Sequence, residues 1–65
     1  MSANESLGRA QELIERLRVK LDELDELAET GDDAAAVDDL AEIAELAKQI
    51  EAEVLRARAS ADAGA

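Results

Sequence analysis

Residues 24–40 read LDELAETGDDAAAVDDL, and this stretch decides the fold. Gly31 follows a helix-forming segment at the place where a left-handed residue ends a helix. Asp32 or Asp33 can then cap a second helix that begins at Ala34. Because a turn of two to four residues makes two helices antiparallel neighbours, the stretch predicts a helical hairpin that reverses at residues 31–33.

Apolar residues on both sides of Gly31 recur at alternating steps of three and four, which is the spacing of a coiled-coil seam. Counted outward from the turn, each residue of the first set pairs with one residue of the second set, and the two residue numbers of every pair sum to 64. The pairs run from Ala28 with Ala36 to Leu7 with Ala57. We therefore expect seven stacked layers between the two helices. The seam positions are Leu7, Ala10, Ile14, Leu17, Leu21, Leu24 and Ala28, then Ala36, Leu40, Ile43, Ala47, Ile50, Val54 and Ala57.

The composition favours helix throughout. The chain has 65 residues, enough for one small domain, and contains no Pro, Cys or aromatic residue. Its Ala, Leu, Glu and Arg are good helix formers, and no alternating β-branched run is present from which a sheet would form. Ser2 and Glu5 fit a capping box, with Asn4 as an alternative cap, so we expect the first helix over about residues 4–30. The second is expected over about 34–60, followed by a frayed tail at 61–65.

Three leucines widen the apolar stripe on one side of the seam. Leu13 and Leu27 lie beside the seam of the first helix, and Leu46 lies at the matching position of the second. A stripe of this width is typical of a helix in a bundle. We therefore expect these three leucines to form a partner interface, where the hairpin meets a second copy in a four-helix bundle or docks on a helix of another protein. The alternative is that they only cover the edges of the seam.

Acidic residues gather around the turn. The net charge is −10, and residues 21–47 hold eleven Asp and Glu but no Lys or Arg, whereas the open end holds the other six acids and all seven bases. Such an acidic tip can bind a basic partner surface or imitate nucleic-acid phosphates, and the alternative is a solvated face that serves only solubility. The tip residues of interest are Asp22, Asp25, Glu26, Asp38, Asp39 and Glu42.

The chain lacks the side chains that several kinds of chemistry require. It has no His, Cys or Tyr, so its hydroxyl groups have no base to activate them, and we expect no enzyme activity. Neither a Gly-rich phosphate loop nor a calcium loop is present, so we expect no cofactor and no metal. The strong acidity argues against direct binding to nucleic acid or to an anionic membrane. Without Cys, a signal peptide or a membrane-spanning stretch, the chain is expected to be cytoplasmic.

The order of a helix, Gly31-Asp32 and a second helix in a short acidic chain resembles the small subunit of exodeoxyribonuclease VII. The resemblance implies a non-catalytic chain that packs its helices on a large catalytic subunit. The chain departs from the family pattern in having no aromatic residue near the start of the first helix. Residues 43–46, Ile-Ala-Glu-Leu, stand where the family has a Tyr-Glu-x-Gly-like stretch.

The sequence therefore predicts a non-catalytic helical interaction module that either associates with itself or acts as the small subunit of a larger assembly, such as a nuclease complex. The alternative is an acidic, nucleic-acid-mimicking inhibitor of a basic DNA- or RNA-binding protein.

Overall fold

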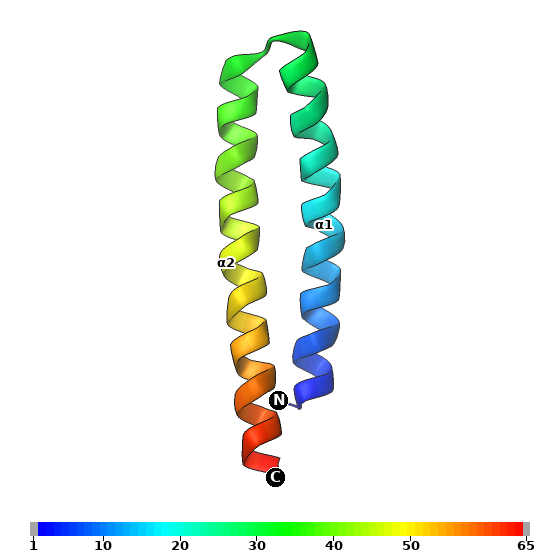
Figure 1. Cartoon of the computed structure of the whole chain (residues 1–65), viewed down its shortest axis with the longest axis vertical. Coiled ribbons are helices and arrows are strands. Elements are labelled where there is room, and N and C mark those ends of the chain that lie inside the picture. Colours follow the sequence, from blue (N-terminus) through cyan, green and yellow to red (C-terminus); the bar gives the residue numbers. More distant parts are fainter. Residues whose placement is uncertain (1, 65) are drawn as a thin grey trace.

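The chain folds into two long helices that lie side by side and run in opposite directions (Figure 1). The computed structural model describes residues 2–64. Helix α1 spans Ala3–Thr30 and helix α2 spans Asp33–Gly64. The Cα atoms extend over 51 × 15 × 12 Å, so the molecule is a thin rod with the turn at one end and both chain ends at the other. The predicted all-α helical hairpin is confirmed.

Ser2 caps helix α1, and the alternative cap Asn4 lies within the helix. The Ser2 hydroxyl oxygen accepts a hydrogen bond from the backbone N–H of Glu5 at 3.1 Å, and the same hydroxyl donates to the Glu5 carboxylate at 3.3 Å. In the expected capping box, the Glu5 side chain would instead accept from the backbone N–H of Ser2. Ser2 and Glu5 are thus joined by two hydrogen bonds, as in a capping box, but the Ser2 hydroxyl replaces the Ser2 backbone N–H as the donor to the Glu5 carboxylate.

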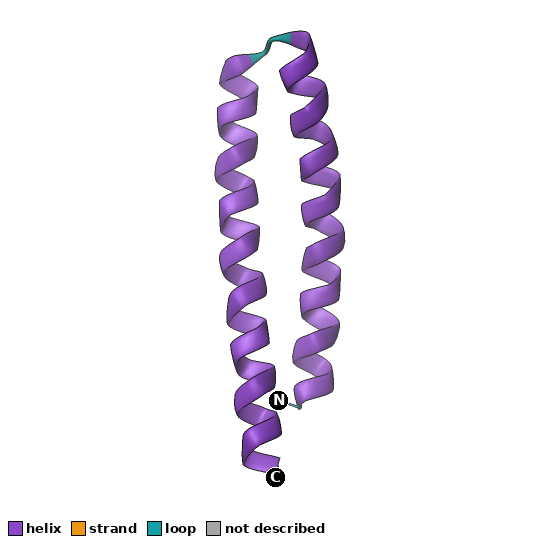
Figure 2. Ribbon diagram, viewed as in Figure 1, coloured by secondary structure: helices purple, strands orange, loops and turns teal. Residues whose placement is uncertain are grey.

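The turn is as short as the sequence predicts, and Figure 2 shows it as the loop that joins the two helices. Gly31 has φ 76° and ψ 19°, the left-handed conformation that a residue with a Cβ adopts only at a cost, and its N–H donates to the carbonyl oxygen of Leu27. Asp32 is the residue that caps α2, because its carboxylate accepts from the N–H of Ala35 at 3.2 Å.

Helix α2 is longer than the sequence predicts. It continues through residues 61–64, where a frayed tail is expected, and the remaining tail residue, Ala65, lies outside the described residues. The segment after Arg58 alternates alanine with other residues, and alanine has the highest helix propensity. Local propensity therefore extends the helix past the end of the predicted seam.

The predicted seam is wrong at half of its positions. In every one of the seven predicted layers, one residue is covered or half-covered and the other is exposed. The exposed members include Leu7, Ile14, Leu21, Leu40 and Val54, whose exposed fractions lie between 38% and 51%. The covered positions that recur at alternating steps of three and four include instead Ser6, Ala10, Leu13, Leu17, Lys20, Leu24 and Leu27 on α1, and Ala36, Asp39, Ile43, Leu46, Ile50, Glu53 and Ala57 on α2.

Each helix is therefore turned about its own axis by roughly 50°, half of the angle between consecutive helix residues. The physical reason is the width of the apolar stripe, which exceeds what a contact between two helices covers. The observed rotation brings Leu13 and Leu27 of α1 and Leu46 of α2 into the contact between the helices. It also lets Lys20 of α1 reach Asp39 and Glu42 of α2.

Candidate interaction surfaces

The rotated seam leaves one broad side of the hairpin apolar. On each helix, a row of exposed apolar residues at seven-residue spacing directly follows, in sequence, a row of residues that lie between the helices. Because α2 runs opposite to α1, a displacement of one residue carries both rows toward the same side of the hairpin. We call this side the apolar face, and it consists of Leu7, Ile14, Leu21 and Ala28 from α1 with Leu40, Ala47 and Val54 from α2.

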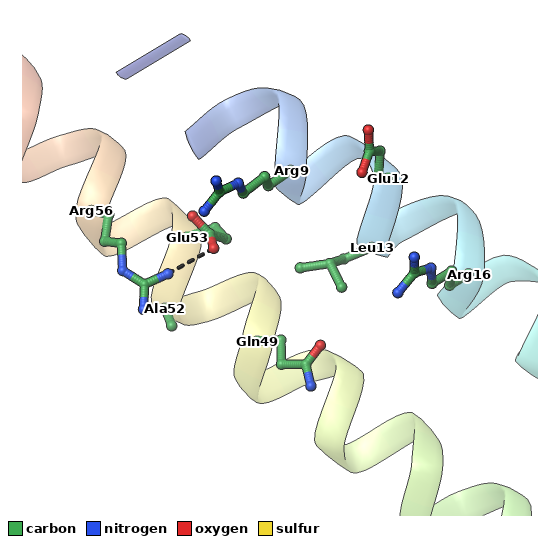
Figure 3. Close-up of a pocket in the computed structure, with 8 residues that line it drawn as sticks. All are labelled: Arg9, Glu12, Leu13, Arg16, Gln49, Ala52, Glu53 and Arg56. Carbon is green, nitrogen blue, oxygen red and sulfur yellow. Dashed lines mark hydrogen bonds and ion pairs between the residues drawn. The ribbon is translucent and has the colours of Figure 1, made fainter. Parts of the chain in front are cut away.

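The opposite side of the hairpin is polar. A shallow pocket there is lined mainly by Arg9, Glu12, Arg16, Gln49 and Arg56 (Figure 3). Leu13 points from α1 toward α2 beneath these charged side chains. A second groove beside it is lined by Val19, Leu46 and the charged residues around them. The surface of this second groove is almost entirely apolar, and charged side chains border it.

Leu13, Leu27 and Leu46 are each half-buried between the two helices. This position agrees with the alternative reading of the sequence, in which the three leucines cover the edges of the seam. Their use as a partner interface stays a prediction. The larger accessible apolar area lies on the other side of the seam, on residues that the sequence reasoning assigned to the core.

The acidic tip residues occupy two different environments. Asp22, Asp25, Glu26 and Asp38 are exposed, whereas Asp39 is only 5% exposed and lies in the seam. Glu42 is exposed but is held by Lys20 of the other helix. The tip therefore presents four of its six predicted carboxylates to solvent, and none of the four has an ion-pair partner within residues 2–64.

Lys20 is the cation at the border of the acidic tip. Its ammonium nitrogen lies 2.5 Å from a Glu42 carboxylate oxygen, 3.1 Å from Glu23 and 3.6 Å from Asp39. The hydrogen bonds to Glu42 and then to Glu23 raise the pKa of Lys20 above its ordinary value of 10.5. Lys20 therefore stays charged at any physiological pH and ties the two helices together at mid-length.

Two of the three carboxyl groups beside Lys20 have pKa values that shift in opposite directions. Burial, followed by the neighbouring Glu23 side chain, raises the pKa of Asp39 above its ordinary value. The hydrogen bond from Lys20 lowers the pKa of Glu23. Because Lys20 is shared among three acids, it does not offset the desolvation of the one that is buried.

Glu53 is the second buried acid of the seam. It is 7% exposed and accepts from the Arg56 guanidinium at 2.6 Å (Figure 3). Within residues 2–64, one oxygen of each buried acid, Oδ2 of Asp39 and Oε1 of Glu53, has no hydrogen-bond partner. Burying a carboxylate oxygen in this way is unfavourable. The single hairpin thus covers charged groups in its seam while it exposes aliphatic ones beside it.

Sequence reasoning missed the charged seam residues Lys20, Asp39 and Glu53. The available signal was that Lys20 and Asp39 each directly precede a predicted seam leucine, and Glu53 directly precedes the seam residue Val54. When each helix turns by roughly 50°, the residue before a predicted seam position moves into the seam. Apolar periodicity alone does not indicate this, because these three residues are charged.

Comparisons of the chain with protein-family models, with curated proteins and with solved structures found no match. Within the described residues, no three His, Cys, Asp or Glu side chains are arranged to hold a metal ion. No helix over that part of the chain combines the length and the apolar character needed to cross a bilayer.

Proposed function

We propose that the chain is a non-catalytic helical interaction module. The observation that carries this proposal is the apolar face, where Leu7, Ile14, Leu21, Leu40 and Val54 are exposed together. A contiguous apolar side on a small protein marks a surface that another protein covers. Because the residues of this face lie on two long helices, we infer that the partner surface is helical as well.

The total exposed area supports this proposal. A folded monomer of 6.9 kDa exposes about 4,000 Å² on average. The hairpin exposes 4728 Å². The excess is about 700 Å², which is close to the area of about 800 Å² that each partner contributes to an interface of standard size.

A nucleic-acid-mimicking inhibitor is the second candidate function. The observation that favours it is the exposure of Asp22, Asp25, Glu26 and Asp38 at a tip without Lys or Arg between residues 21 and 47. Under this function, binding to a basic protein weakens steeply as salt is raised. Replacing these four acids by Asn or Gln removes the binding and leaves the apolar face intact.

The resemblance to the small subunit of exodeoxyribonuclease VII names one possible assembly for the first candidate. It places the chain on a large catalytic subunit and stays a prediction. Under this reading, the partner that covers the apolar face is a helical region of that larger subunit.

Site-specific photo-cross-linking in the native cells tests the proposed function. A benzoylphenylalanine at position 14 replaces an exposed residue of the apolar face, and the same group at position 19 replaces Val19, which is exposed outside that face. We expect protein adducts from position 14 and not from position 19. Equal yields from both positions, or adducts from neither, contradict the proposal.

A further inference from the structure

We propose that the partner is a second copy of this chain, which covers the apolar face in a two-fold four-helix bundle with the two turns at opposite ends. This inference rests on the proposed function and identifies its partner. It is carried by the internal symmetry of the apolar face, by the charge distribution and by the size of the face.

The exposed row of α1 is symmetric about its own middle. A two-fold axis midway between Ile14 and Leu21 places Ile14 of one copy opposite Leu21 of the other. The same axis places Leu7 opposite Ala28, so a large side chain meets a small one at each end of the row. The row is therefore complementary to itself when the second copy is reversed.

The same two-fold axis also fits the exposed row of α2. Its middle is Ala47, with Leu40 and Val54 at equal distances on either side. Helix α1 ends at Thr30 and α2 begins at Asp33, so residues whose numbers sum to about 63 lie at the same level, which puts the middle of the α1 row beside α2 residues near 45. The two midpoints differ by about two residues, or about 3 Å at 1.5 Å per residue. One axis therefore serves both rows, and the alanine at its centre permits close approach.

Charge selects the reversed orientation. If both turns lay at the same end, two acidic tips with eleven acids each and no base between residues 21 and 47 would meet. Reversal instead places each tip beside the open end of the other copy, where all seven bases lie within residues 9–20 and 48–58. Because the open end also holds six acids, its net charge is only about +1, so the reversed bundle acts by removing the repulsion between the two tips.

The broad side of the hairpin that carries the apolar face is about as large as a stable dimer interface. The broad side of the hairpin measures 51 × 15 Å between Cα atoms, which matches the area of about 800 Å² per partner in a standard interface. Its centre is aliphatic along both helices, as expected for the core of a bundle.

Sedimentation equilibrium tests the second copy as the partner. We expect the wild type to sediment at twice 6.9 kDa. The double variant Ile14→Glu, Leu40→Glu buries two unpaired carboxylates per copy, so its dimer dissociation constant rises at least about a hundredfold. The matched control Val19→Glu, Leu55→Glu carries the same charges on exposed aliphatic positions outside the face and stays dimeric.

A wild type that stays monomeric at hundreds of micromolar overturns the inference. So does a dimer that the control variant disrupts while the face variant leaves it intact. If the wild type is monomeric and position 14 still cross-links to a different protein in cells, the proposed function stands and only the identity of the partner is wrong.

A distance measurement tests the orientation without relying on destabilised variants. Glu29 is an exposed residue near the turn, and the chain has no Cys, so Glu29→Cys accepts a single spin label. Glu29 lies about 11.5 residues from the proposed axis, so opposite turns separate the two labels by about 35 Å along the bundle, at about 1.5 Å per residue. Labels within about 25 Å would place the turns side by side and overturn the proposed orientation, since packed helices lie about 8–10 Å apart.

Discussion

Gly8 lies inside α1, where its conformation requires no glycine. A Cβ built on this residue meets no atom within 4 Å, and Gly31 is the glycine with a positive φ. The substitution Gly8→Ala therefore introduces no clash. It removes the entropic cost of a glycine within a helix, which is about 1 kcal/mol relative to alanine.

The size of the chain converts this free energy into a melting temperature. A chain of 65 residues has an unfolding entropy of about 0.14 kcal/mol per kelvin, from about 2.1 cal/mol per kelvin for each residue. A gain of 1 kcal/mol then raises Tm by about 7 °C. Circular dichroism at 222 nm during a thermal scan measures it, with both proteins at one concentration because dimerisation makes Tm concentration-dependent.

Gly31→Ala is the matched control, because the same substitution falls on φ 76° in the turn. There the added Cβ is strained by about 1–2 kcal/mol, so Tm falls. A lower Tm for Gly8→Ala would refute the reasoning from open space around Gly8. Gly8 lies on the side of α1 away from α2 and outside the apolar face, so loss of the dimer in Gly8→Ala would show that the partner docks on that outer side.

Three further predictions concern the charged seam and the first cap. Burial raises the pKa of Asp39, so the folded state favours its protonated form, and stability is lost as the pH rises above the ordinary value of 3.8. Asp39→Asn should therefore raise Tm at pH 7 but not below about pH 3, whereas the exposed neighbour control Asp38→Asn should change it little; a lower Tm for Asp39→Asn would contradict the assignment. Lys20→Gln should lower Tm at pH 7, and by less in 1 M NaCl because salt screens the lost ion pairs; an effect independent of salt would show that packing alone is involved. Ser2→Ala should cost about 1 kcal/mol in chemical denaturation, and an unchanged midpoint would mean that the cap contributes nothing.

The topology of the hairpin was predictable because its signals are local. The glycine at position 31 and the capping groups of Ser2 and Asp32 act within four residues of themselves, so the sequence alone indicates where α1 begins and where the chain reverses. The end of α2 was less predictable, because the alanine-rich segment carries no stop signal before Gly64.

The rotation of the seam was not predictable because it depends on a balance between two edges of one apolar stripe. Turning the helices one way covers Ile14, and turning them the other way covers Leu13. Apolar periodicity favours the first, whereas the observed structure adopts the second, in which Lys20 reaches Asp39 across the helices. The same rotation explains why Asp39 is not an exposed tip residue and why the apolar face was assigned to the core.

The position of the chain ends has a consequence for how this rod is attached to anything else. The start of α1 and the end of α2 lie at the same pole, opposite the turn, with α2 reaching farther than α1 (Figure 1). A domain fused to either end therefore leaves the turn and the sides of the rod sterically accessible. In a reversed dimer, two such fused domains would sit at opposite poles, and the bundle would act as a rigid spacer that holds them about one hairpin length apart.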